Sequence, residues 1–264
     1  MNWRYVIKSK DRTDVLKNKT YSFLKKYGVE DKDVDIFVST NDNVVEYKTC
    51  FPNCNIIKGP LGIANIDNFI VDYYEENQYY IYLNDDIRDI NFAKDSKTLV
   101  SLADMTDNAI DTFKNFISVH FYNMKKLNIS YGGLYPVMNP YFMRGSKDTF
   151  RTDLCLIMDP FSFVINNKKI KLNNFYLDEE FNENMYSDFE KTILHFETNG
   201  ALYRLNHYSL DVMYFNGKDT SNRTAERAPL AAELMLAAYP EYLQSIKYLK
   251  NGFCSLRFKR IKNR

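Results

Sequence analysis

The sequence lacks most of the motifs that identify common enzyme classes. It contains only three histidines in 264 residues, so a Ser-His-Asp system has few ways to form. No GxSxG elbow, GxGxxG loop or P-loop occurs, and the segment Gly217-Lys218-Asp219-Thr220 lacks the upstream glycine of a Walker motif. The familiar hydrolase, dinucleotide-binding and P-loop signatures are therefore unmatched.

Cysteines and long apolar runs are also scarce. Of the four cysteines, Cys50 and Cys54 form a CxxxC pair without a second pair nearby, which is a poor pattern for zinc. No apolar run is long enough to span a membrane, and no signal peptide precedes Trp3. We therefore expect free thiols, no membrane partner and a cytoplasmic protein, in the cytoplasm of the host cell if the chain is viral.

Charge is balanced overall but uneven along the chain. The net charge of +1 gives no global nucleic-acid signature. After Glu241, however, no acidic residue occurs, whereas seven basic residues do: Lys247, Lys250, Arg257, Lys259, Arg260, Lys262 and Arg264. This segment is either a solvated tail or a surface that follows phosphates.

Short apolar runs alternate with helical periodicity over the first hundred residues. Buried strands are predicted at residues 5–7, 34–39, 54–58 and 79–83. Helices are predicted from Thr13 or Asp14 to about Tyr27, with Gly28 as the stop, and over residues 62–74. The order β-α-β-β-α-β is typical of a nucleotide-binding half of an α/β protein.

The rest of the chain has a different pattern. Helices are predicted over residues 107–126, 189–198 and 230–238, and the apolar runs within 153–165 are typical of strands. No flexible linker separates the halves. We therefore predict one α/β domain, residues 1–264, with a nucleotide-binding half (1–106) and a mixed-sheet half (107–264) that ends in the basic segment.

The most informative stretch is an apolar strand that runs into Asn84-Asp85-Asp86. In open α/β sheets, ligands bind at the carboxyl ends of the strands. Two adjacent carboxylates there repel each other, and a hard cation shared with a diphosphate would relieve that repulsion. The simpler alternative is a solvated turn, because Asp is a common turn residue.

Several polar segments occur in an order that resembles a known enzyme class. They are Lys10-Asp11-Arg12, the helical segment 62–68, Asn84-Asp85-Asp86, Gly132-Gly133, and Ser187-Asp188-Phe189-Glu190 followed by Asn199-Gly200. This succession resembles the GT-A nucleotide-sugar glycosyltransferases. It looks closest to those associated with DNA-base hydroxylases, which include base-J glucosyltransferases and phage enzymes that glycosylate hydroxymethyl-pyrimidines in DNA.

The resemblance implies a donor site and a metal site. Asn84-Asp85-Asp86 would be the DxD-type motif, with Asn in its first position. Asp86, Asp85 and His207 would bind Mn²⁺ or Mg²⁺. The UDP-sugar, with UDP-glucose expected, would contact Ser9, Asp11, Arg12, Asn65, Asn68, Asn84, Asp85, Gly132 and Gly133. A structural histidine, a surface arginine, a polar helix face and an ordinary glycine turn are the simpler interpretations of these residues.

The resemblance also implies the catalytic base. Asp188 matches the acid of the family motif, although Ser187 stands where another acid is usual, and Glu190 is the alternative base. An inverting transferase needs such a carboxylate to take the proton of the acceptor hydroxyl. The expected acceptor is a hydroxymethylated cytosine or uracil in DNA. A glycan or protein acceptor, and a non-catalytic nucleotide-binding module, remain as alternatives.

Overall fold

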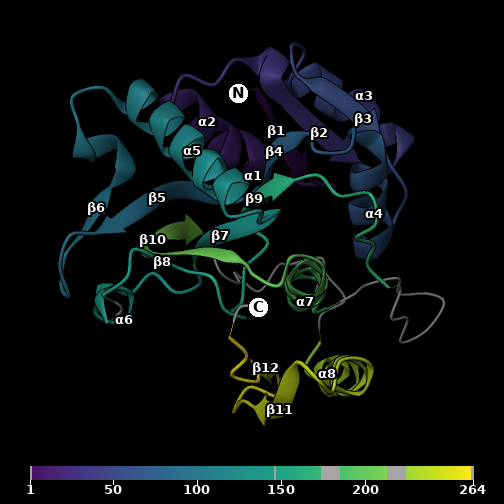
Figure 1. The fold of residues 1–264 in the computed structure, drawn as a ribbon. Coiled ribbons are helices and arrows are strands. Elements are labelled where there is room, and N and C mark those ends of the chain that lie inside the picture. Colours follow the sequence, from purple (N-terminus) through teal and green to yellow (C-terminus); the bar gives the residue numbers. More distant parts are fainter. Residues whose placement is uncertain (1, 146, 174–184, 213–223, 263–264) are drawn as a thin grey trace.

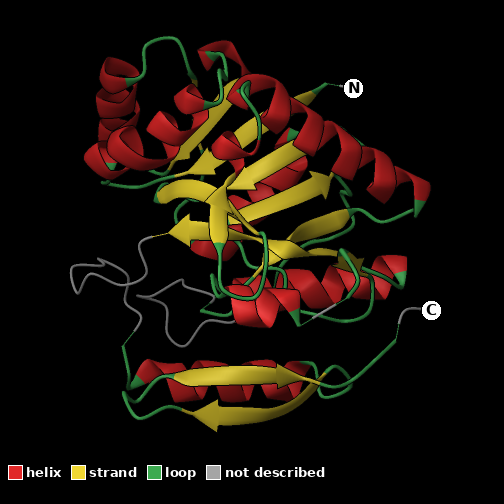
Figure 2. Ribbon diagram, turned by 90° about the vertical axis from the view of Figure 1, so that its left-hand side faces the viewer, coloured by secondary structure: helices red, strands yellow, loops and turns green. Residues whose placement is uncertain are grey.

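The computed structural model describes residues 2–145, 147–173, 185–212 and 224–262, which form an α/β molecule around one large mixed sheet (Figures 1 and 2). Its strands are β1 (Trp3–Lys8), β2 (Val34–Val38), β3 (Asn55–Lys58), β4 (Tyr79–Leu83), β5 (Ile87–Ala93), β6 (Leu99–Ser101), β7 (Tyr131–Tyr135), β8 (Phe150–Arg151), β9 (Phe161–Ile165) and β10 (Tyr203–Val212). A separate hairpin consists of β11 (Leu243–Tyr248) and β12 (Cys254–Phe258). The predicted α/β class is confirmed.

The helices begin with a nearly continuous stretch made of α1 (Thr13–Leu16), the π-helix η1 (Lys17–Tyr21) and α2 (Ser22–Lys26). The others are α3 (Asn41–Cys50), α4 (Ile63–Tyr73), α5 (Ala109–Lys126), α6 (Pro140–Arg144), α7 (Ser187–Asn199) and α8 (Arg227–Ala238), with short 3₁₀ turns η2 (Asp31–Asp33) and η3 (Leu102–Met105). Among the described residues, no helix combines the length and apolarity needed to cross a bilayer.

The strand order brings several strand ends to one edge of the sheet. The order is β3-β2-β1-β4-β9-β7-β10-β5-β6, with β8 also paired to β10. Strands β1 to β4 are parallel, β9 is antiparallel to its neighbours β4 and β7, and β7 and β10 are parallel. The carboxyl ends of β1, β4, β7 and β10 therefore meet at one edge, called here the carboxyl edge.

Helices cover both faces of this sheet. Along β4, Ile81 and Leu83 belong to the core beneath α1, α2 and α5, whereas Tyr80 and Tyr82 belong to the core beneath α4 and α7. Burial on both faces explains why the strand is a continuous apolar run in the sequence. Figure 1 shows α5 above the sheet and α7 below it.

The C-terminal elements form a small layer below α7 (Figures 1 and 2). Helix α8 and the β11–β12 hairpin share an apolar core with α7, in which the Phe189 and Phe258 rings stack at 5.1 Å between centroids. Beyond β12, the chain returns to the main body, where Leu154 N donates to Ile261 O at 3.1 Å. The end of the described chain is therefore bound to the main body of the fold.

The structure differs from the predicted elements at three places. Residues 41–50 form helix α3, which the sequence pattern did not indicate because its apolar residues do not gather on one face; only Asn43 and Tyr47 are buried. The Leu154–Met158 run is not a strand, and only Phe161–Ile165 of that region joins the sheet. Helix α8 begins at Arg227, three residues before the predicted start, while its end at Ala238 agrees.

Candidate active site

Three predicted donor-site residues meet where β1 and β4 end. Ser9 Oγ donates to Asp85 Oδ2 at 2.7 Å, and Arg12 Nη1 lies 3.2 Å from Asp85 Oδ1. Tyr47 completes the group, since its hydroxyl lies 2.7 Å from Ser9 Oγ and accepts from Arg12 N. The first loop of the chain and the end of β4 therefore form one polar unit at the carboxyl edge.

Asp85 is held in a nearly water-free position. Its side chain is only 5% exposed, and this burial raises its pKa to about 6, although Arg12 and the Ser9 hydrogen bond act in the opposite direction. The turn that carries Asp85 is fixed by backbone contacts: Asn84 N donates to Pro160 O, and Thr20 Oγ1 donates to Asn84 O. A carboxylate with a raised pKa is one that a nearby cation would stabilise.

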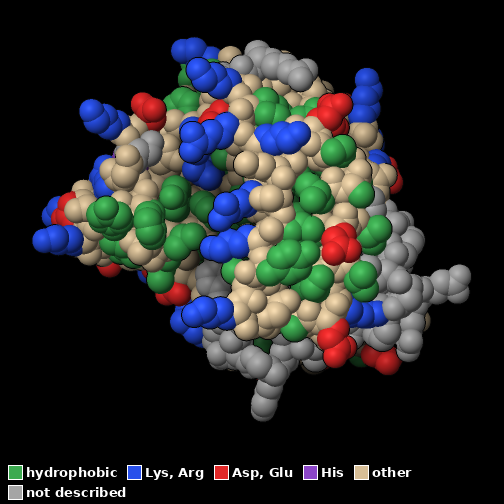
Figure 3. Space-filling model, turned by 90° about the horizontal axis from the view of Figure 1, so that it is seen from below, with side chains coloured by type: hydrophobic (Ala, Val, Ile, Leu, Met, Phe, Trp, Pro, Cys, Tyr) green, Lys and Arg blue, Asp and Glu red, His purple; other side chains and the backbone are tan. Residues whose placement is uncertain are grey.

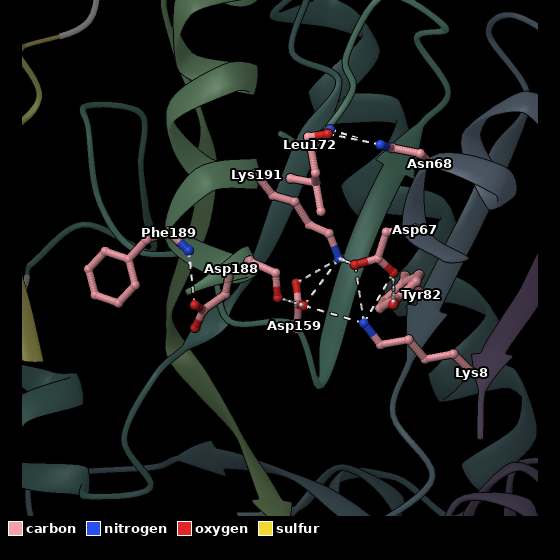
Figure 4. A network of polar contacts seen from close by, with 10 residues as sticks. Lys8, Asp67, Asn68, Tyr82, Asp159, Leu172, Asp188, Phe189 and Lys191 are labelled. Carbon is pink, nitrogen blue, oxygen red and sulfur yellow. Dashed lines mark hydrogen bonds and ion pairs between the residues drawn. The ribbon is translucent and has the colours of Figure 1, made fainter. Parts of the chain in front are cut away.

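A second polar group lies on the α4 and α7 side of the same edge (Figure 4). Lys191 Nζ lies 2.9 Å from Asp67 and 3.1 Å from Asp159, while Lys8 Nζ lies 3.1 Å from Asp67 and 3.8 Å from Asp159. Tyr82 donates its hydroxyl hydrogen bond to Asp67. We call Lys8, Asp67, Asp159 and Lys191 the four-charge network, in which two cations face two carboxylates.

The network neutralises its own charges. Burial alone would raise the pKa of Asp67, but Lys191 and Lys8 outweigh it and the pKa is lowered. Burial would likewise lower the pKa of Lys191, but Asp159 and Asp67 raise it. The ionised forms of Asp67 and Lys191 therefore stabilise one another, whereas for Lys8 burial outweighs the two carboxylates and its pKa is lowered.

Asp188 lies beside this network at the start of α7. Its neighbour Ser187 donates to Asp159 Oδ2 at 3.2 Å, and Lys191 is one helical turn further on. Asp188 Oδ1 accepts from Phe189 N (Figure 4). Because Asp159 precedes the Pro160 that binds Asn84, the start of α7 and the end of β4 are joined through a single connection, residues 159–160.

Glu190, the alternative base, has a different environment. It is fully buried, and its Oε1 accepts from Asn173 N, Asn173 Nδ2 and the Tyr239 hydroxyl. These contacts join α7 to residue 173 and to the residue that follows α8. The structure thus places Glu190 in a contact that joins α7 to Asn173 and Tyr239.

Three other residues predicted to contact the donor form hydrogen bonds with other parts of the protein. Asp11 has a left-handed backbone (φ 54°) and accepts from Asn43 at the first turn of α3. Asn65 donates to Leu61 O. Asn68 donates to Leu172 O and accepts from Leu172 N, so it fixes the segment after β9.

The two glycines of β7 are explained by protein packing. A Cβ on Gly132 would lie 2.7 Å from Tyr203 O, and a Cβ on Gly133 would lie 2.6 Å from Ile157 Cγ2. Both contacts are too short for any other residue. Glycine at these positions lets β7 approach β10 and the chain before Asp159, so a close approach to a sugar is not needed to explain it.

His207 is not brought to the end of β4. On β10, Tyr208 lies opposite Phe92 and Val212 opposite Ile87, so His207 stands five positions from the strand end that adjoins Asp86. That spacing corresponds to roughly 15 Å. His207 Nδ1 instead lies 3.2 Å from Arg144 Nη1. Within the described residues, no group of three His, Cys, Asp or Glu side chains is placed to hold a metal ion.

Sequence reasoning missed the four-charge network. Two signals were available: Asp67 lies among the apolar residues of a helix face, and Lys191 follows Asp188 at the i+3 spacing that places both on one side of α7. Asp159 and Lys8 carry no comparable local signal. Their role appears only when β1 and β9 adopt their places in the sheet.

No family model matches the chain, and no curated protein matches it. The chain is similar to Staphylococcus aureus TarS 1–349 in complex with UDP-GlcNAc (12% identity, TM-score 0.49), with 89% of this chain and 67% of that one covered. It is also similar to a mannosyltransferase from Pyrobaculum calidifontis in complex with GDP-Man and Mn²⁺ (9% identity, TM-score 0.37), with 62% of this chain and 44% of that one covered. A mycobacterial protein is similar as well (7% identity, TM-score 0.48), with 100% of this chain and 85% of that one covered. The chain spans 40% of a longer TarS structure. With TM-scores below 0.5, the function must be argued from the site.

Proposed function

We propose that the chain is a GT-A glycosyltransferase that moves a sugar from a UDP-sugar, with UDP-glucose as the expected donor, to an acceptor hydroxyl. One observation carries the proposal. The loop after β1, the carboxylates after β4 and the acid that opens α7 converge at the carboxyl edge, joined by Ser9–Asp85, Asn84–Pro160 and Ser187–Asp159. Open α/β sheets bind nucleotides at such an edge.

Donor binding would use the group around Asp85. Arg12 is about one third exposed and already directed at an anion, so a diphosphate can replace or share its contact with Asp85. Asp85 and Asp86 fit Mg²⁺ or Mn²⁺ of the kind that takes one or two protein carboxylates and completes its shell with substrate phosphates and water. Such an ion would offset the charge that develops on the departing diphosphate.

Asp188 would act on the acceptor. Its carboxylate takes the proton of the acceptor hydroxyl while that oxygen forms a bond to the anomeric carbon and the bond from this carbon to the diphosphate oxygen breaks. UDP leaves, and the sugar is transferred with inversion. The four-charge network supports this role because it fixes the first turn of α7, which carries Asp188, through Ser187 and Lys191.

The proposed acceptor is a hydroxymethylated pyrimidine in DNA. The C-terminal hairpin and the chain after it expose Lys247, Lys250, Arg257, Lys259, Arg260 and Lys262, none of which has an ion pair within the part of the chain that the structure describes. Lys and Arg side chains gather in a band across this lower face (Figure 3). Such a band could bind phosphates, and a duplex base would have to flip out to reach the edge.

The proposal is tested by a transfer assay. The chain is mixed with UDP-glucose and a duplex that contains 5-hydroxymethylcytosine or 5-hydroxymethyluracil, with Mn²⁺, with Mg²⁺ and with a chelator. Metal-dependent transfer to the modified duplex and none to unmodified DNA is expected, and Asp86→Ala should abolish it. Donor hydrolysis without DNA transfer would instead favour a glycan or protein acceptor. Neither hydrolysis nor transfer, with UDP binding retained, would identify a non-catalytic module.

A further inference from the structure

Two arginines face each other on neighbouring strands of the lower face. Arg204 of β10 pairs in register with Arg151 of β8. Directly opposed residues of an antiparallel pair have Cβ atoms about 5 Å apart, where like charges destabilise the sheet. Arg151 binds Asp153 through both Nε and Nη2, so this carboxylate already has a partner.

Arg204 is the unneutralised member of this pair. It is only 8% exposed, and its Nε is buried without a hydrogen-bond acceptor. Among the described residues, no carboxylate forms an ion pair with it. Its contact is the face of the Tyr135 ring, 5.0 Å from the guanidinium carbon. Burial lowers its pKa, and the neighbouring Arg151 acts in the same direction.

Such a charge is costly without an anion. A buried guanidinium keeps its proton, and an uncompensated buried ion costs several kcal/mol. Cys155 does not supply the negative charge, because burial raises the pKa of its thiol to about 11. The side chains around Arg204 thus leave a net positive charge facing the lower side of the sheet.

The surroundings of Arg204 lead to the candidate active site. Tyr135 also lines a small hollow together with Leu134, Pro136, Met158, Pro160, Phe161 and Leu210. Pro160 is the residue that binds Asn84 at the end of β4. On the other side, Leu154 N binds Ile261 O, which places the basic C-terminal segment beside Asp153 and Cys155.

We propose that Arg204 and Arg151 form a binding site for a phosphate group. A guanidinium presents its donors in a fork that suits phosphate oxygens, and two opposed forks suit a tetrahedral anion better than either suits a single carboxylate. The phosphate comes either from the backbone of a polymeric acceptor that lies across the lower face or from free inorganic phosphate. Only the first source rests on the function proposed above.

The first test measures thermal stability without donor or acceptor. The wild-type melting temperature in 50 mM sodium phosphate should exceed that in sodium chloride of equal ionic strength by roughly 2–4 °C. Arg204→Met should lose this shift, while its melting temperature in chloride stays equal or rises because an uncompensated charge is removed. Lys114→Met, on the exposed side of α5, makes the same change of charge and should keep the shift.

A second variant keeps the test decisive if Arg204→Met does not fold. Arg151→Met changes a side chain that is 40% exposed and should also lose the phosphate shift. A full shift in both variants, or its loss in Lys114→Met, would overturn the site and leave a general salt effect.

The source of the phosphate is identified with a labelled 12-base-pair duplex. A larger loss of duplex affinity in Arg204→Met than in Lys114→Met, which removes an exposed cation from α5 on the other face of the sheet, assigns the site to an acceptor backbone. Equal losses would overturn that source and leave inorganic phosphate as the ligand. Because no sugar transfer is measured, failure of this inference can be told from failure of the proposed function.

Discussion

The four-charge network and the Arg204 site show two ways in which this fold buries charge. In the network, Lys8 and Lys191 face Asp67 and Asp159, and each ion has partners of opposite sign within about 4 Å. At the second site, Asp153 pairs with Arg151, and among the described residues no carboxylate pairs with the opposed Arg204. The first arrangement is complete within the protein, whereas the second leaves one charge for a ligand.

This difference distinguishes charges that hold the fold together from a charge that can bind a ligand. The charges of a balanced network lose their water when the chain folds. Their ion pairs then hold together β1, α4, α7 and Asp159, which precedes β9. An unbalanced charge remains available to an anion from outside. Neighbouring charged residues can therefore have opposite consequences for stability when they are removed.

Lys191→Met should have the largest effect, because it breaks the balanced network. Removal of one partner leaves Asp67 and Asp159 with one cation between them, and we expect a loss of about 3–5 kcal/mol in the free energy of unfolding. Urea unfolding at pH 7 measures it. The double variant Lys191→Met/Asp67→Asn restores equal numbers of charges and should recover part of the loss. A single-variant loss near that of Arg204→Met would remove the distinction between the two sites.

Asp188→Asn should separate chemistry from support at the start of α7. Asn keeps the shape and accepts hydrogen bonds but takes no proton, so kcat should fall by about 10²-fold or more while donor KM and unfolding free energy change little. Asp42→Asn is the matched control, an exposed acid in the first turn of α3. A variant that lost stability instead of turnover would place Asp188 among the supporting charges.

The fold also buries a titratable group, the imidazole of His195, that it keeps neutral. His195 on α7 stacks on Tyr131 at 4.3 Å, and burial, with the nearby charge of Lys191, lowers its pKa to about 3. Between that value and about 6.5 the unfolded chain binds the proton and the folded chain does not, so stability falls as pH falls.

His195→Gln should therefore weaken the acid sensitivity. From pH 7 to pH 5, this one histidine should account for about 2 kcal/mol of lost stability, and the variant should lose less by that amount. Urea unfolding at pH 7, 6 and 5 gives the slopes. Parallel slopes for wild type and variant would show that the imidazole is already protonated in the folded state or exposed there.

The sequence predicted those parts of the fold and site that depend on local pattern. The buried strand before Asn84, the helix that Gly200 ends with a left-handed φ of 71° and the polar loop at Ser9–Arg12 all have local signals, and the structure brings Ser9, Arg12 and Asp85 together. The functional roles of these residues stay predictions.

The remaining features depend on tertiary structure. The pairing of Arg204 with Arg151 needs β8 and β10 in register, and the network needs β1, α4 and α7 to converge. Neither follows from spacing along the chain. The glycines of β7 are the opposite case. The Gly132-Gly133 pair suggested a ligand contact in the sequence, but close packing against Tyr203 and Ile157 explains it.

The smallest effect is expected on the exposed basic segment, where each charge is solvated. Ile261 is packed against the main body and Lys259 N donates to Tyr242 O, so truncation after Phe258 would disturb packing as well as charge. Substitution of Lys259, Arg260 and Lys262 by Gln removes the charges alone. If the acceptor is DNA, the log–log dependence of affinity on salt should become shallower by about 0.9 for each phosphate that the variant no longer neutralises. Donor hydrolysis should hardly change, because the segment lies apart from Asp85 and Arg12. If the triple Gln variant keeps the wild-type slope while Arg204→Met reduces it, phosphate is bound by the buried arginine and not by the exposed segment.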